Sequence, residues 1–138
     1  NEIFPDKRLS KSKAALAIFQ AYLMEYPQTT LEEMRQAFPC DKLNQYYSGR
    51  YYQDLFYPSC PDTVDEGGYE ILQYTAGKHI GKEARAKWDF YLDADQLLPI
   101  EGGSKRAMCV KFWRKRDFES LAEWVSQKYK FIDVQKCL

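Results

Sequence analysis

The side chains that most often carry out catalysis are scarce in this chain. Its one histidine, His79, lies in a polar stretch beside two glycines, and we interpret it as a solvated surface residue. A nucleophile needs a base within reach and a carboxylate that orients the base. The acids Asp89, Asp93 and Asp95 flank an extended run, where such residues usually form solvated turns. We therefore predict no catalytic residue and no enzyme.

Two motifs of phosphate chemistry are present only in part. A nuclease of the restriction type needs an Asp, followed on a neighbouring strand by an acid-x-Lys pair that holds a divalent ion. Asp62 is available, but the nearest follow-up, Glu83-Ala84-Arg85, lacks the lysine. The segment Gly102-Gly103-Ser104-Lys105 lacks the spacing of a phosphate-binding loop and is more typical of a hairpin turn.

The cysteines do not have the spacing of a metal site. Cys40, Cys60, Cys109 and Cys137 form no C-x-x-C pair, and one histidine cannot complete a zinc site with them. We expect no metal and no cofactor, and we expect reduced thiols in a cytoplasmic protein. Cys109 lies in an apolar run and reads as a small core residue.

Basic and aromatic residues alternate in residues 111–116, between an expected strand and an expected helix. Lysine and arginine neutralise phosphate, and the start of a helix also offers backbone N–H groups. We compare this basic tip in function to the wing of a winged helix. The candidate nucleic-acid contacts here are Lys111, Trp113, Arg114, Lys115 and Arg116.

A second candidate segment, residues 44–53, is rich in amides and tyrosines. Amide and guanidinium groups read base edges, and tyrosine rings stack on unpaired bases. The candidate nucleic-acid contacts here are Asn44, Gln45 and Arg50. The alternative is a protein interface or self-association surface, because tyrosines also favour such contacts. Its candidate residues are Tyr46, Tyr47, Tyr51 and Tyr52.

Apolar spacing and capping residues predict three helices in residues 1–57. Ser12 can cap a helix over residues 13–26, which Pro27 ends. Thr30 and Glu33 have the spacing of a capping box for a second, short helix.

The third helix is expected to follow the second after a very short turn. Asp41 can cap it, and it would continue through Tyr47 to an end or kink at Gly49. Three helices at this spacing are typical of a helix-turn-helix.

In the rest of the chain, the sequence pattern predicts a loop and then a small sheet with one helix. Residues 58–68 contain two prolines, two glycines and three acids, which is typical of an acidic loop between two lobes. In residues 69–138 we expect a ββαβ lobe whose hairpin turns near Gly102-Gly103. The elements expected there are extended runs over 88–100 and 107–112, a helix capped by Asp117, and a closing strand over 131–134.

These elements together predict an α+β fold, with an N-terminal helix-turn-helix-like lobe and a small antiparallel sheet with one helix. The chain begins at Asn1 rather than Met, so we expect one compact unit from a longer protein. No apolar run reaches the roughly 18 residues that a membrane helix needs, so we expect no membrane partner.

Residues 15–44, ALAIFQAYLMEYPQTTLEEMRQAFPCDKLN, resemble the helix-turn-helix portion of small accessory modules in bacterial restriction and mobile-element proteins. Ala107-Met108-Cys109-Val110, with Trp113 and residues 118–129, resembles the strand-helix unit that follows such segments. The resemblance implies a non-catalytic nucleic-acid-binding or assembly module on a larger protein. The chain departs from that pattern in the acidic loop and in its neutral net charge.

Charge is unevenly distributed, although lysines and arginines balance acids at 20 each. Residues 58–101 hold four bases and nine acids, a net charge of −5, and residues 102–138 hold nine bases and four acids, a net charge of +5. Nucleic-acid contact must therefore be local. Our first hypothesis is a non-catalytic nucleic-acid-binding accessory domain, with DNA as the expected ligand. The alternatives are the tyrosine-rich protein interface and, third, a sensor of small molecules between the lobes.

Overall fold

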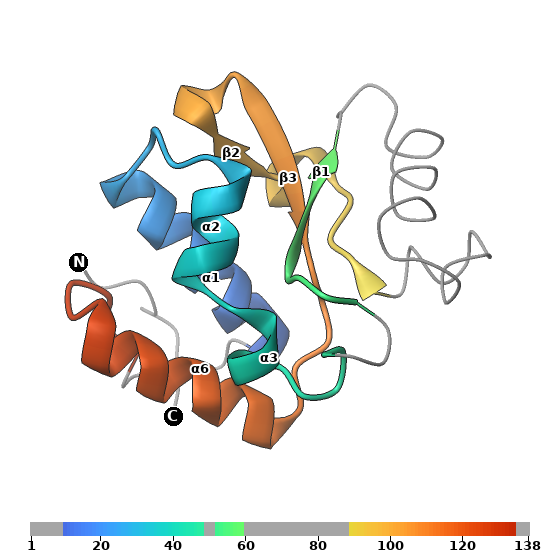
Figure 1. Ribbon diagram of the computed structural model, residues 1–138, viewed down its shortest axis with the longest axis vertical. Coiled ribbons are helices and arrows are strands. Elements are labelled where there is room, and N and C mark those ends of the chain that lie inside the picture. Colours follow the sequence, from blue (N-terminus) through green and yellow to red (C-terminus); the bar gives the residue numbers. More distant parts are fainter. Residues whose placement is uncertain (1–9, 49–51, 60–88, 135–138) are drawn as a thin grey trace.

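Figure 1 shows the computed structural model of the chain, which describes residues 10–48, 52–59 and 89–134. His79, Asp62, Glu83 and the greater part of the acidic loop therefore lie outside the described residues, as do Arg50 and Tyr51. The described part confirms the α+β prediction: helices come first, then a three-stranded antiparallel sheet, and a last helix follows the sheet.

Helix α1 (Lys11–Glu25) begins two residues earlier than the sequence predicts. Its cap is Ser10, whose Oγ accepts from the N–H of Lys13 at 3.2 Å, and not Ser12. Pro27 follows the helix and has no N–H with which to continue it. Buried side chains occupy several faces of α1, because it packs against both β2 and α6. Its buried residues are Ala14, Ala15, Leu16, Ile18, Phe19 and Leu23.

Helix α2 (Leu31–Ala37) confirms the predicted capping box. The Thr30 N–H donates to Glu33 Oε1 at 2.9 Å, and the Glu33 N–H donates to Thr30 Oγ1 at 3.1 Å. Two of the orphan N–H groups at this helix end are thereby satisfied. The Nε of Arg35 then donates to the carbonyl of Phe56 at 3.1 Å, which ties α2 to the first strand.

Helix α3 (Cys40–Leu43) is much shorter than predicted. It follows Pro39 rather than a cap at Asp41, and it ends at Asn44 instead of continuing through Tyr47. The reason lies in the Asn44 side chain, which donates to the carbonyl of Phe112 at 3.0 Å and accepts from the N–H of Tyr47 at 3.3 Å. An asparagine that bonds the backbone in this way competes with the helical ladder.

The sheet has the order β1-β3-β2, formed by β1 (Phe56–Ser59), β2 (Leu98–Ile100) and β3 (Lys105–Cys109). The predicted hairpin is confirmed between β2 and β3, where Gly102 and Gly103 adopt φ angles of +71° and +89°. Short 3-10 turns at Ala94–Gln96 and Glu101–Gly103 flank β2.

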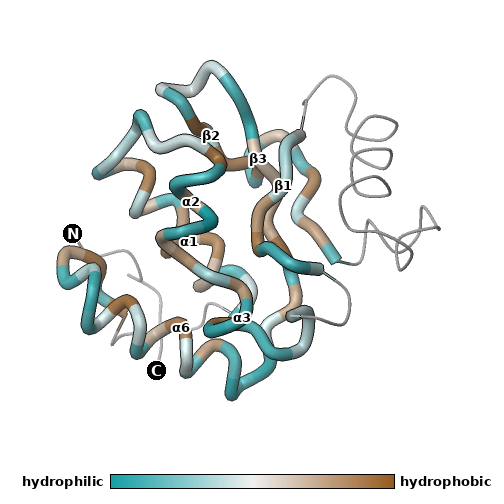
Figure 2. Tube along the Cα trace, viewed as in Figure 1, coloured by the Kyte–Doolittle hydropathy of each residue, from teal (hydrophilic) through white to brown (hydrophobic). Residues whose placement is uncertain are grey.

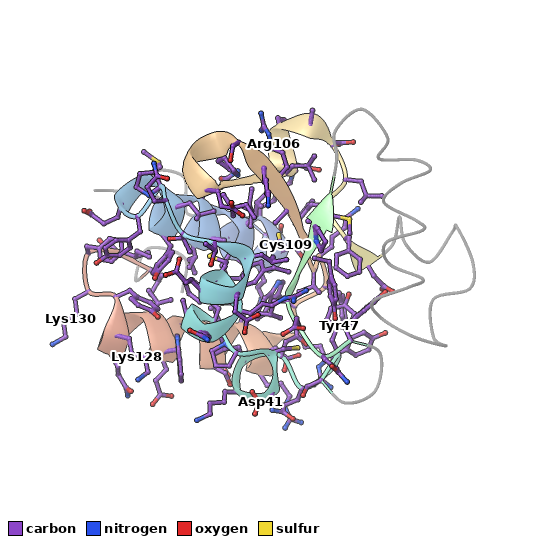
Figure 3. All side chains as sticks on the ribbon, turned by 45° about the horizontal axis from the view of Figure 1, so that its top comes forward. Asp41, Tyr47, Arg106, Cys109, Lys128 and Lys130 are labelled. Carbon is purple, nitrogen blue, oxygen red and sulfur yellow. The ribbon has the colours of Figure 1, made fainter. Side chains whose placement is uncertain are left out.

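The strand predicted around residue 90 is wrong in the described residues. Phe90 forms an isolated bridge with Val110, whereas β1 pairs with β3 in the register Phe56 to Cys109. The residues around Phe90 lie on the edge of β3 that β2 occupies: the N–H of Tyr91 donates to the carbonyl of Cys109 at 3.1 Å, and the 3-10 turn at Ala94–Gln96 interrupts the pairing before β2 begins. Cys109 itself is buried, as predicted, and Figure 3 shows it in the interior.

Helix α6 (Lys115–Lys128) confirms the predicted amphipathic helix but begins earlier, with Arg114 rather than Asp117 at its N-cap. Figure 2 shows hydrophilic and hydrophobic residues alternating along it. In Figure 1, α6 crosses below α1 and α3. The indole N–H of Trp124 and the hydroxyl of Tyr129 both donate to the carbonyl of Ala37, each at 2.9 Å, and so attach α6 to α2.

The closing strand predicted over residues 131–134 is also wrong. The chain turns after α6, with the N–H of Ile132 donating to the carbonyl of Tyr129 at 3.0 Å. Ile132 and Val134 are buried in the core instead of pairing with a strand. The described residues on both sides of the acidic loop share one hydrophobic core, to which Phe19, Phe56 and Leu121 all belong.

Candidate nucleic-acid interface

The two segments that the sequence singles out separately lie against each other in the structure. The Asn44 amide donates to the carbonyl of Phe112, and the N–H of Gln45 donates to Oδ1 of Asp117 at 3.0 Å. Figure 1 shows how this arises: the chain leaves β3, passes the end of α3 and enters α6. Residues 44–46 and 111–117 therefore lie together at the start of α6.

Two predicted contacts are wrong because their side chains are buried. Asn44 is fully buried, and its amide is used to fix the end of α3. Trp113 is 4% exposed and packs into the core, with its ring 6.1 Å from that of Phe19. The indole N–H of Trp113 has no acceptor among the described residues. Neither side chain can contact a ligand on the surface.

Arg114 has mainly a structural role, because it pairs with a buried carboxylate. Its guanidinium group contacts the carboxylate of Asp117 through two bonds, Nε to Oδ2 at 2.7 Å and Nη2 to Oδ1 at 3.3 Å. The hydrogen bond that Arg114 donates to Asp117 raises the pKa of Arg114. Asp117 is 1% exposed, so this ion pair neutralises a buried carboxylate. The guanidinium also lies over the ring of Tyr46, 5.7 Å from its centroid.

Phe112 is the large apolar side chain that this surface leaves exposed, at 44%. Its ring meets the partly buried ring of Tyr46 edge to face, with centroids 4.8 Å apart. This geometry is the one that aromatic pairs prefer, and it holds Phe112 in place without covering it.

Three exposed cations belong to the same surface: Lys111, Lys115 and Arg116. The ammonium group of Lys111 lies 5.6 Å from the ring centroid of Tyr91. Asp117 occupies the first turn of α6, so its negative charge offsets the positive end of the helix dipole. The attraction for an anion therefore comes from the side chains rather than from the helix end. We call Gln45, Tyr46, Lys111, Phe112, Arg114, Lys115 and Arg116 the aromatic-basic face.

The tyrosine-rich surface predicted as a protein interface is wrong for two of its four members. Tyr47 and Tyr52 are buried, and their hydroxyls donate to Asp89 at 3.4 and 2.6 Å. Burial raises the pKa of Tyr47 far above its ordinary value. Asp89, which the sequence suggested was solvated, is 6% exposed. This cluster joins the end of α3 to residue 89 and does not present tyrosines to a partner.

Sequence reasoning missed the roles of Phe112 and Asp117. Phe112 and Trp113 are adjacent aromatic residues, and only one of them faces the core. The sequence pattern does not indicate which of the two rings is buried and which is exposed. From the sequence, Asp117 is interpreted as a helix cap because Asp is common at that position. In the structure its carboxylate instead accepts from the N–H of Gln45 and pairs with Arg114.

The other predicted chemistry-bearing residues do not gather into a site in the described part of the chain. Asp93 and Asp95 are exposed beside a 3-10 turn, as expected of turn formers. No group of three or more His, Cys, Asp or Glu side chains in residues 10–48, 52–59 and 89–134 is placed to hold a metal ion. Cys40 and Cys109 are free and buried.

Comparison of the chain with protein-family models, curated proteins and solved structures finds no match. The resemblance to accessory modules of restriction and mobile-element proteins therefore stays a prediction. Among the helices that the structure describes, none combines the length and the apolar character needed to cross a membrane.

Proposed function

We propose that this chain is a non-catalytic module that binds nucleic acid through the aromatic-basic face, with a preference for single strands. The observation that carries the proposal is the exposed ring of Phe112, held by Tyr46 and accompanied by exposed cations. Proteins that bind single strands combine cations that follow the backbone with aromatic rings on which bases stack.

The preference for a single strand follows from what the face lacks. Reading duplex DNA in the major groove requires a helix or ribbon that carries base-reading side chains into the groove. Helix α3 has four residues, and the amide of Asn44 is buried beneath it. An aromatic ring, in contrast, needs an unpaired base, which a duplex does not offer.

Charge supports the same proposal. The nine bases and four acids of residues 102–138 give this part of the chain a net charge of +5, and three of those bases are the exposed cations of the face. Cations that are not already paired contribute most to phosphate binding, because each can release a counterion. Arg114, paired with Asp117, contributes by holding Tyr46 in place.

The test is a fluorescence anisotropy titration of labelled single-stranded DNA, single-stranded RNA and duplex DNA at about 50 mM salt, where phosphate contacts are strong. We expect both single strands to bind more tightly than the duplex. Phe112→Leu keeps the side chain apolar but removes the stacking surface, so affinity for single strands should fall about tenfold, since base stacking contributes roughly 1–3 kcal/mol.

Met24→Leu is the matched control, because Met24 is 78% exposed on α1, outside the face. It should leave binding unchanged. Equal affinity for duplex and single strands, or a Phe112→Leu variant that binds as well as the parent protein, would contradict stacking on Phe112.

A further inference from the structure

A hollow of about 510 Å³ lies at the junction of α1 and α2, on surface that the aromatic-basic face does not include. It is lined by the last turn of α1, the turn that follows and the first turn of α2, including Tyr22, Glu25, Tyr26 and Glu33. Its volume falls within the roughly 300–1,000 Å³ of small-molecule sites.

The rim of the hollow is fixed by hydrogen bonds. The N–H and the hydroxyl of Thr29 donate to the carbonyl of Tyr26, at 3.2 and 2.6 Å. The N–H of Glu101 donates to the carbonyl of Thr29 at 2.9 Å, and that of Gly102 to the carbonyl of Pro27 at 2.7 Å. The turn after α1 is thus attached to the β2–β3 hairpin, so the hollow has a preformed wall.

The walls are aromatic. The rings of Tyr22 and Tyr26 lie 5.0 Å apart between centroids with their planes at 52°, and Tyr26 is 48% exposed. The ring of Phe131 meets that of Tyr26 edge to face, with centroids 5.8 Å apart. Burial raises the pKa of Tyr22, and so do the neighbouring Tyr129, Tyr26 and Glu33.

The charge of the hollow is negative. Glu25 and Glu33 line it, and none of the described residues that line it is basic. Helix α1 ends here with no basic residue in its last turn, so the negative end of its dipole is not compensated from within the helix. Pro27 has no N–H to offer the carbonyl of Leu23, four residues before it. One oxygen of Glu33 accepts from Thr30, but its negative charge remains.

We propose that this hollow binds an organic cation of the alkylammonium type, with the rings of Tyr22 and Tyr26 and the carboxylate of Glu25 as its main contacts. Ring faces attract a cation within about 6 Å of the centroid, and carboxylates reinforce that attraction. A hard metal ion prefers a shell of oxygen ligands, and no set of three or more acidic, His or Cys side chains among the described residues offers one.

The probe is choline, compared with its neutral carbon isostere, dimethylbutanol, in NMR titrations of isotope-labelled protein. We expect choline to shift the amide signals of residues 22–33 and the isostere to bind at least about threefold more weakly, as a cation–π contact at an exposed site implies. Equal binding of the two compounds, or choline shifts confined to other residues, would overturn the proposal.

Two variants at exposed positions connect binding to the hollow. Glu25→Gln removes one charge and Tyr26→Leu removes one ring, and each should weaken choline binding at least about threefold. Glu119→Gln, an exposed carboxylate on α6, is the matched control for charge and should change nothing. If both Glu25→Gln and Tyr26→Leu keep native NMR spectra and bind choline normally, the hollow is not the site.

The source of the cation is resolved by a second ligand, a short peptide that contains trimethyllysine. If the peptide and choline both bind, the hollow takes a side chain of a partner, and if choline alone binds, it takes a free small molecule. Either result supports recognition of an alkylammonium group, and binding of neither overturns it.

Discussion

Replacing Lys111, Lys115 and Arg116 together with glutamine removes the exposed cations of the aromatic-basic face. Arg114 is left intact, because its loss would leave the buried carboxylate of Asp117 without its cation and destabilise the start of α6. Glutamine keeps the length and most of the polarity of these side chains, so the variant should fold normally.

The expected effect is worked from the number of phosphate contacts. Each cation that neutralises a phosphate of a single strand contributes about 0.7 to the slope of log affinity against log salt, so three contribute about 2. Between about 50 and 200 mM salt, the parent protein should therefore lose roughly sixteenfold more affinity than the triple variant does. Anisotropy titrations at four or five salt concentrations measure both slopes.

The control is a second triple variant with the same change of charge: Arg106, Lys128 and Lys130 to glutamine. Figure 3 labels these exposed cations: Arg106 is on β3, and Lys128 and Lys130 are at the C-terminal end of α6. Lys128 is about 20 Å along a helix of this length from Lys115, which belongs to the face. If both triple variants lower the slope equally, binding follows net charge and the face is not the site. If neither lowers it, these cations do not contact phosphate.

Three further predictions concern the fold that holds these sites. Tyr52→Phe removes a buried hydrogen bond to a carboxylate, so it should lower the free energy of unfolding in urea by about 1.5–3 kcal/mol, against about 0.5–1.5 kcal/mol for Tyr129→Phe, which loses a bond to a neutral carbonyl. Equal losses would show that the hydrogen bond from Tyr52 to Asp89 contributes no more than the bond from Tyr129 to a backbone carbonyl. Gly102→Ala should lower the free energy of unfolding by about 1–2 kcal/mol, because the φ of this residue is +71°. Adding Gln28→Ala should restore only the part of that loss due to the clash with the glutamine amide, which lies 2.8 Å from the new Cβ. Full recovery in the double variant would show that backbone strain is negligible. Burial raises the pKa of the Cys40 thiol to about 12, so iodoacetamide at pH 8 should label it slowly in the folded protein and rapidly in urea, as peptide mass spectrometry can measure; rapid labelling before unfolding would contradict its burial.

Elements whose signals are local could be read from the sequence. The capping box needs only Thr30 and Glu33 at a spacing of three, and the amphipathic α6 needs only its own apolar period. The β2–β3 hairpin follows from two consecutive glycines, which are free to adopt positive φ angles. In each of these the interacting atoms lie within a few residues of one another, so the α+β class followed directly from the pattern.

Features that depend on distant contacts could not be read in this way. Helix α3 stops at Asn44 because that side chain bonds the carbonyl of Phe112, far along the chain. One edge of β3 pairs with β1, about 50 residues earlier in the chain, and on the other edge a 3-10 turn at Ala94–Gln96 separates the bridge at Phe90 from β2.

The candidate site shows the same division most clearly. Residue types alone drew attention to residues 44–53 and 111–116, because cations, amides and aromatic rings are what nucleic acid requires. Which of those side chains reach solvent was decided by the packing of the core: it buries Trp113 and Asn44, pairs Arg114 with Asp117, and leaves Phe112 exposed. The sequence by itself thus determined the chemistry available, and the tertiary structure decided which of it is on the surface, because burial is a property of the whole packed chain.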